Sequence, residues 1–196
     1  ALRQTRTEKR ENTIKWLDRN EKNKIIRVVN DISFWKKENL MKRNRLIIYF
    51  MLFGGLRLTE VANLKKNDIN TNNLVINVLG KGNKNRKIDM NREVYSAYIE
   101  WLEIDKNDSP YIFTSQKGEK ITTQGIQHVF NKVKEVTKIH DLTPHVLRHT
   151  FAHDLSQLGT SLNIIGDILG HENLETTRIY TSSSKDERKK AINSLI

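Results

Sequence analysis

Apolar residues recur at helical spacing through much of this chain. After a charged start, one face of an early helix is lined by Ile25, Ile26, Val28, Val29 and Ile32. The segment from about Lys42 to Phe53 has a wide apolar face, which predicts a deeply buried helix that Gly54-Gly55 ends. Thr59 is placed to cap a short helix from Glu60 to Leu64.

The second half of the chain repeats this spacing in separate segments. We expect helices at about Arg92–Glu103, Thr123–Thr137, Pro144–Leu158, Leu162–Leu169 and Leu174–Thr181. Thr143 is a good N-cap residue, and Pro144 has the fixed φ that suits a first helical turn.

Between these two sets of helices the pattern changes to period two. The alternating positions are Leu74, Ile76 and Val78, and then Arg86, Ile88 and Met90. The turn Gly80-Lys81-Gly82-Asn83 lies between the two runs, so the pattern predicts a hairpin with a basic tip. A further strand is expected at Tyr111–Phe113. The predicted fold class is therefore α+β, mainly α-helical with a small three-stranded antiparallel sheet.

Composition narrows the class of protein. The 196 residues suffice for one domain with a proper core, and the absence of cysteine excludes disulfides, zinc–thiolate sites and thiol nucleophiles. The longest apolar run, Leu46–Phe53, is too short to span a membrane. The sequence shows no signal-peptide pattern at its start, so we expect a cytoplasmic protein without a membrane partner.

The charge is unevenly distributed along the chain. The net charge is +11, and residues 1–45 carry 14 basic against 6 acidic residues, whereas residues 91–196 carry 13 basic against 14 acidic. A positive field confined to one half suits a polyanion, because neutralising phosphates releases counterions. Double-stranded DNA is therefore the expected partner, although a solubilising surface would give the same count.

Several polar residues stand beside apolar ones without an evident structural reason: Arg57, Lys81, His145, Arg148, His171 and Tyr180. Two guanidinium groups match phosphate oxygens and would stabilise a pentacoordinate transition state. A phenol needs a base to become a nucleophile, and His145 in a first helical turn is suited to that role, because the helix dipole favours neutral imidazole. A lysine at a hairpin tip could protonate a leaving alkoxide. The set suits attack of a tyrosine on a phosphodiester.

The motifs that contain these residues resemble those of the tyrosine site-specific recombinases, which include phage and transposon integrases and the Xer recombinases. Gly55-Leu56-Arg57-Leu58-Thr59-Glu60 resembles their first arginine box, and residues 80–86 (GKGNKNR) resemble their lysine hairpin. Residues 145–152 (HVLRHTFA) and Leu169-Gly170-His171 resemble their second box, and Tyr180 stands at the nucleophile position. The resemblance covers about Trp16 to Thr181 and implies the catalytic fold of these enzymes.

The resemblance also implies a role for each matching residue. Arg57, Arg148 and His171 would hold the scissile phosphate, His145 would act as the base, Lys81 as the acid and Tyr180 as the nucleophile. Glu60 would support the arginine box. A 3′-phosphotyrosyl intermediate would preserve the bond energy, so no cofactor is implied.

The implied organisation has three parts and several partners. Residues 1–12 would be a charged interdomain linker whose N-terminal DNA-clamping domain is absent here, 13–182 the catalytic domain, and 183–196 a tail helix for inter-subunit docking. The active assembly would be a homo-tetramer on paired DNA sites, with C-terminal helix exchange, accessory DNA-bending or directionality proteins, and a place in the nucleoid.

Alternatives remain open for single residues and for the outcome of the reaction. Arg57 could simply pair with Glu60, and His145, His149 and His153 recur every four residues like a row of metal ligands, although Arg148 beside them would repel a cation. The basic residues expected to contact DNA are Lys42, Arg43, Arg45, Lys84 and Arg86. A type IB topoisomerase or a non-catalytic DNA-binding module would share most of these features.

Overall fold

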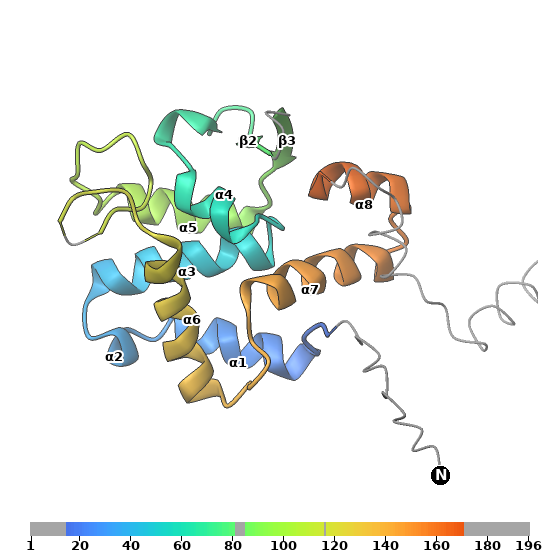
Figure 1. Cartoon of the computed structure of the whole chain (residues 1–196), viewed down its shortest axis with the longest axis horizontal. Coiled ribbons are helices and arrows are strands. Elements are labelled where there is room, and N and C mark those ends of the chain that lie inside the picture. Colours follow the sequence, from blue (N-terminus) through green and yellow to red (C-terminus); the bar gives the residue numbers. More distant parts are fainter. Residues whose placement is uncertain (1–14, 81–84, 116, 171–196) are drawn as a thin grey trace, which may run out of the picture.

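The computed structural model describes residues 15–80, 85–115 and 117–170 of the chain. Figure 1 shows these residues as a helical assembly with a small sheet at one side. In chain order the elements are α1 (Arg19–Val29), α2 (Ile32–Trp35), α3 (Glu38–Leu52), α4 (Leu58–Asn63), the 3-10 turn η1 (Lys66–Asp68), β1 (Ile69–Asn70), β2 (Val75–Leu79), β3 (Asn85–Asp89), α5 (Arg92–Leu102), α6 (Thr123–Thr137), α7 (Pro144–Gln157) and α8 (Leu162–Leu169).

The first helix ends earlier than the apolar pattern predicts. Asp18 accepts a hydrogen bond from the Glu21 N–H at 2.8 Å, and the Glu21 carboxylate accepts from the Asp18 N–H at 3.1 Å, which closes a capping box at the start of α1. The chain then turns at Asn30, and Asp31 caps α2 by accepting from the Ser33 N–H. Ile32 therefore lies mostly exposed and off the buried face of α1.

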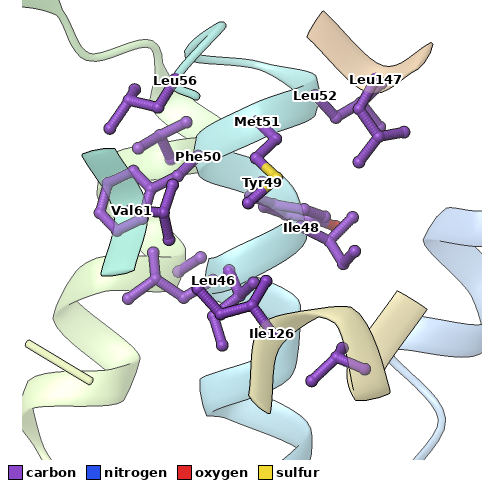
Figure 2. Packing of buried hydrophobic residues seen from close by; sticks show 14 of the residues in the cluster. Leu46, Ile48, Tyr49, Phe50, Met51, Leu52, Leu56, Val61, Ile126 and Leu147 are labelled. Carbon is purple, nitrogen blue, oxygen red and sulfur yellow. The ribbon is translucent and has the colours of Figure 1, made fainter. Parts of the chain in front are cut away.

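Helix α3 is the centre of the main core. Every residue from Asn44 to Leu52 is buried, which confirms the prediction of a deeply buried helix. Figure 2 shows its side chains packed against Val61 of α4, Ile126 of α6 and Leu147 of α7. Helices from both halves of the chain pack on α3. The same core therefore holds both arginine-bearing segments, the one after α3 and the one after α6.

The sheet has the strand order β1-β2-β3, and both pairings are antiparallel. Ile76 of β2 is opposite Ile69 on one side and Ile88 on the other. A three-stranded antiparallel sheet is confirmed, but the predicted third strand is wrong. Tyr111 makes only an isolated bridge to Lys65, and the third strand is the two-residue β1.

The last two described helices complete the fold. Thr143 caps α7 by accepting from the Val146 N–H at 3.2 Å, as predicted, with Pro144 in the first turn. Helix α8 lies against α7 and beside β3 (Figure 1). Its buried side chains, Ile165 and Leu169, pack with Ala152 of α7 in a small cluster separate from the main core. Within the described ranges, no helix is long and apolar enough to cross a bilayer.

Candidate active site

The turn after α3 brings two distant segments together. Gly55 has a φ of +64°, and a Cβ atom there would lie 2.5 Å from Cδ1 of Phe151 in α7 and 3.1 Å from Cδ2 of Leu169 in α8. Only glycine fits this combination of backbone conformation and close approach. The turn therefore packs directly on α7 and α8, and it delivers Arg57 beside both helices.

Arg57 is the N-cap residue of α4, and Glu60 holds it in place. The Glu60 carboxylate accepts from the Arg57 backbone N–H at 2.7 Å and from its Nη1 at 2.9 Å. Arg57 Nη2 also donates to the Gly170 carbonyl at 3.2 Å. The predicted N-cap, Thr59, is therefore wrong, because the reach of Glu60 back to Arg57 starts the helix two residues earlier. About a third of the Arg57 side chain remains exposed, at 34%.

Glu60 is shared by a second arginine, which comes from the hairpin. Arg86 of β3 donates from Nη1 and Nη2 to the two Glu60 oxygens at 2.7 and 2.9 Å, and from Nε to the Ile168 carbonyl at 3.0 Å. Burial alone would raise the pKa of Glu60, but the hydrogen bonds from Arg86 and Arg57 outweigh it and lower the pKa to about 2. The carboxylate is therefore ionised and fixed between two guanidinium groups.

In these contacts Arg86 binds protein groups, and its expected contact with DNA stays a prediction. Its side chain is 10% exposed and turns inward, so all three of its nitrogens bond to protein groups. The sequence carried the signal for this placement, because the alternation put Arg86 on the same strand face as the buried Ile88.

Arg148 lies on α7 and forms the floor of the site. The residue is 5% exposed, and it donates to the Gly55 carbonyl through Nη1 and to the Leu169 carbonyl through Nη2, the latter at 2.6 Å. Arg57 and Arg148 thus bind the adjacent carbonyls of Gly170 and Leu169. The structure thus brings these two arginines and Glu60 close to one another at the end of α8.

The histidines of α7 have different surroundings. His145 lies exposed in the first turn, while His149 is half-buried. The pKa of His149 is lowered by burial and by electrostatic interaction with its neighbours His145 and Arg148. The ring of His153 stacks on that of Trp16, with 4.3 Å between the ring centroids, and its side chain is 20% exposed. Among the described residues, no group of three or more acidic, histidine or cysteine side chains is placed to hold a metal ion.

The basic residues of α3 contact protein groups in this structure. Arg45 is buried, with Nη2 2.6 Å from Glu100 and Nη1 3.1 Å from Asn30, so it joins helices inside the fold and cannot reach a phosphate without breaking this pair. Lys42 pairs with Glu38 at 2.9 Å. Burial lowers the pKa of Arg43, whose Nε donates to Asn44. DNA contact by Lys42 and Arg43 stays a prediction.

Four of the predicted site residues lie outside the described residues: Lys81, Lys84, His171 and Tyr180. The predicted helix at Leu174–Thr181 and the parts 1–12 and 183–196 also lie outside them. The described site therefore consists of Arg57, Glu60, Arg86 and Arg148. His145 lies exposed on the same helix as Arg148, three residues before it.

The profile of the phage integrase family matches residues 15–187 of the chain. The chain belongs to the phage integrase family. This membership confirms the resemblance inferred from the arginine boxes and the hairpin motif.

Curated relatives in this family are similar over most of the chain. The tyrosine recombinase XerC of Leptospira interrogans is 35% identical over 176 residues, which cover 86% of this chain and 57% of that protein. XerC of Staphylococcus epidermidis is 37% identical over 153 residues, which cover 76% of this chain and 52% of that protein. The integrase-family chain thus spans about half the length of the curated relatives it matches.

Solved structures of the family share its architecture. The XerH recombinase bound to its difH substrate before cleavage matches with a TM-score of 0.77 and 28% identity, over 92% of this chain and 54% of that chain. The XerA recombinase matches with a TM-score of 0.74 and 28% identity, over 92% of this chain and 64% of that chain. The predicted fold class, a tyrosine recombinase catalytic fold, is confirmed.

Proposed function

We propose that this chain is the catalytic part of a site-specific DNA recombinase that cleaves and rejoins strands through a 3′-phosphotyrosyl intermediate on Tyr180. The observation that carries the proposal is the convergence of Arg57 and Arg148 on the adjacent carbonyls of Gly170 and Leu169. The next residue in the sequence is His171, and Tyr180 follows nine positions later. Two guanidinium groups fixed at the start of this segment supply the charge that a phosphoryl transition state needs.

The roles of the residues follow from two successive transesterifications. The Tyr180 oxygen would attack the phosphorus atom while the bond from phosphorus to the 5′ oxygen breaks. His145 would take the phenolic proton, and Lys81 would give a proton to the departing oxygen. The 5′-hydroxyl of another strand would then attack the phosphotyrosine and release Tyr180. Because one phosphoester replaces another in each step, the cycle requires no external energy source and no cofactor.

Glu60 has a supporting role in this proposal. Its ionised carboxylate binds both the backbone and the side chain of Arg57, which limits the directions in which that guanidinium can point. A preorganised cation costs little reorganisation when charge develops on the phosphate. Replacing Glu60 would therefore change the orientation of Arg57 more than it would change the affinity for DNA.

The proposed partner is double-stranded DNA. The relatives are recombinases, and XerH has been solved with difH DNA both before and after cleavage. For this chain we propose a homo-tetramer on paired sites, with residues 183–196 exchanged between neighbours, in the nucleoid of the cytoplasm. Accessory DNA-bending or directionality proteins would set the direction of the reaction. Lys84, Lys42 and Arg43 are the proposed DNA contacts.

Covalent trapping tests the nucleophile. The chain is incubated with a pool of nicked DNA duplexes of randomised sequence. Cleavage near the nick releases a short fragment that diffuses away, so the covalent adduct cannot be religated. The adducts are then separated in SDS, and the DNA that they carry is sequenced. We expect wild type to form an adduct with phosphate on Tyr180, identified by peptide mass spectrometry. Tyr180→Phe should bind DNA as tightly and form none, because the phenol oxygen is absent.

Three results would contradict the proposal. An SDS-resistant adduct in Tyr180→Phe would remove Tyr180 as the nucleophile. Adducts on all sequences alike, together with relaxation of any supercoiled plasmid, would identify a topoisomerase instead. Wild-type chain that binds DNA and yields no adduct would identify a binding module.

A further inference from the structure

The last carbonyls of α8 are each bound by a different arginine. Ile168 accepts from Arg86 Nε at 3.0 Å, Leu169 from Arg148 Nη2 at 2.6 Å, and Gly170 from Arg57 Nη2 at 3.2 Å. The three arginines come from β3, from α7 and from the N-cap of α4. We call these three contacts the α8 clamp.

The clamp satisfies groups that a helix leaves unpaired. The last carbonyls of an α-helix have no partner within the helix and lie at the negative end of its dipole, so cations are favoured there. Helix α8 has a short apolar contact, the cluster of Ala152, Ile165 and Leu169. The guanidinium groups therefore help to fix the end of α8.

Arg86 differs from the other two arginines of the clamp. It is 10% exposed, and it joins Ile168 to both oxygens of Glu60, the carboxylate that also orients Arg57. Gly170 packs against it, because a Cβ atom there would lie 2.8 Å from Arg86 Cδ. One side chain on β3 thus contacts the end of α8 and the group that orients Arg57.

We infer that Arg86 is a positioning residue for strand cleavage. Through Glu60, it fixes the position of the end of α8 relative to Arg57. The inference rests on the proposed function. Arg86 would not touch the phosphate, but would set the geometry of the two phosphate-binding arginines, Arg57 and Arg148. Strand β3 would thereby affect cleavage through Arg86, which would not itself contact DNA.

The test separates positioning from phosphate contact. Arg86→Lys keeps the charge but loses the three-way fork, and Lys87→Ala is the matched control, because Lys87 is the exposed neighbour on β3. The probe is the nicked duplex that wild type cleaves best from the randomised pool. Single-turnover cleavage is measured at saturating protein, and the dissociation constant is measured over a series of salt concentrations.

We expect cleavage by Arg86→Lys to fall about 100-fold, because misplacement by about an ångström has that effect. Its DNA affinity and the salt dependence of that affinity should equal those of wild type. Lys87→Ala should cleave like wild type, and any loss of a phosphate contact there would appear as a change of about 0.9 in the salt slope. Cleavage by Arg86→Lys near the wild-type rate would overturn the inference. So would Arg86→Ala with a salt slope reduced by about 0.9, which would identify a phosphate contact.

Hydrogen exchange tests the clamp without any cleavage. Exchange of the amides in α8 should accelerate in Arg86→Lys while exchange in α3 stays unchanged, and equal protection of α8 in both proteins would overturn the inference. If wild type forms no adduct, the proposed function fails, while this exchange measurement still decides the clamp. If Arg86→Lys does not fold, the double variant Arg86→Gln with Glu60→Gln removes both charges together and takes its place.

Discussion

The packing around α3 and the attachment of α8 rely on different interactions. Helix α3 is buried from Asn44 to Leu52 and packs on helices from both halves of the chain. Helix α8 packs through Ile165 and Leu169 on Ala152 of α7, and it ends on carbonyls that bind three arginines. Apolar packing tolerates changes of pH, whereas the clamp depends on charge and on the directions of hydrogen bonds. The fold and the assembly of the site can therefore fail separately.

The largest expected effect distinguishes these two regions directly. Phe50 of α3 and Leu169 of α8 are both fully buried. Phe50→Ala should lower the free energy of unfolding by about 3–5 kcal/mol and accelerate hydrogen exchange in every helix. Leu169→Ala should accelerate exchange chiefly in α8, because that helix can detach locally. Equal acceleration of α3 by both variants would show one cooperative unit and remove the distinction.

Acid should weaken the clamp while the main core stays intact. The pKa of Glu60 in the folded chain is about 2, below its ordinary value of 4.5, so its contribution is present above pH 4.5 and is lost as the pH falls toward 2. This lowering of the Glu60 pKa corresponds to about 3 kcal/mol of folding stability. Because other carboxylates also titrate, the measurement is the difference in unfolding free energy between wild type and Glu60→Gln.

That difference should shrink toward zero between pH 4.5 and 2, since a protonated Glu60 resembles glutamine. The exchange rate of α8 amides should rise over the same interval in wild type. A difference that stays constant with pH would show that the charge of Glu60 contributes nothing to stability.

The same contrast explains what the sequence could predict. Regular apolar periods predicted α6 at its observed bounds, Thr123–Thr137, and placed α3 in the core. The strand β1 was missed because two residues cannot display a period, and Tyr111–Phe113 was taken for a strand from its composition. Local patterns therefore predict elements well when the elements are long.

The clamp could not be predicted, because it joins positions far apart in the chain. Arg57, Arg86 and Arg148 were singled out by motif, but no local pattern indicates that each binds a carbonyl of α8. Arg45 shows the same limit, since its charge suggested a DNA contact while its partner, Glu100, stands more than fifty positions away. Motifs identified the catalytic candidates, and tertiary contacts decide what each arginine binds.

The smallest expected effect isolates the contact between Gly170 and Arg86. Gly159 and Gly170 flank α8 and both have positive φ, at +81° and +63°, but a Cβ atom at 159 would meet nothing within 4 Å, whereas one at 170 would lie 2.8 Å from Arg86 Cδ. Both substitutions to alanine incur the backbone cost of about 1 kcal/mol. Gly170→Ala must also displace Arg86, whose far end is held by Glu60. Gly170→Ala should therefore be the more destabilising of the two variants in urea unfolding.

Gly170→Ala should also accelerate exchange in α8 and raise the pKa of Glu60, as measured by NMR titration, while Gly159→Ala leaves that pKa unchanged. Equal effects of the two variants would mean that Arg86 yields freely and that the clamp does not depend on the position of its side chain.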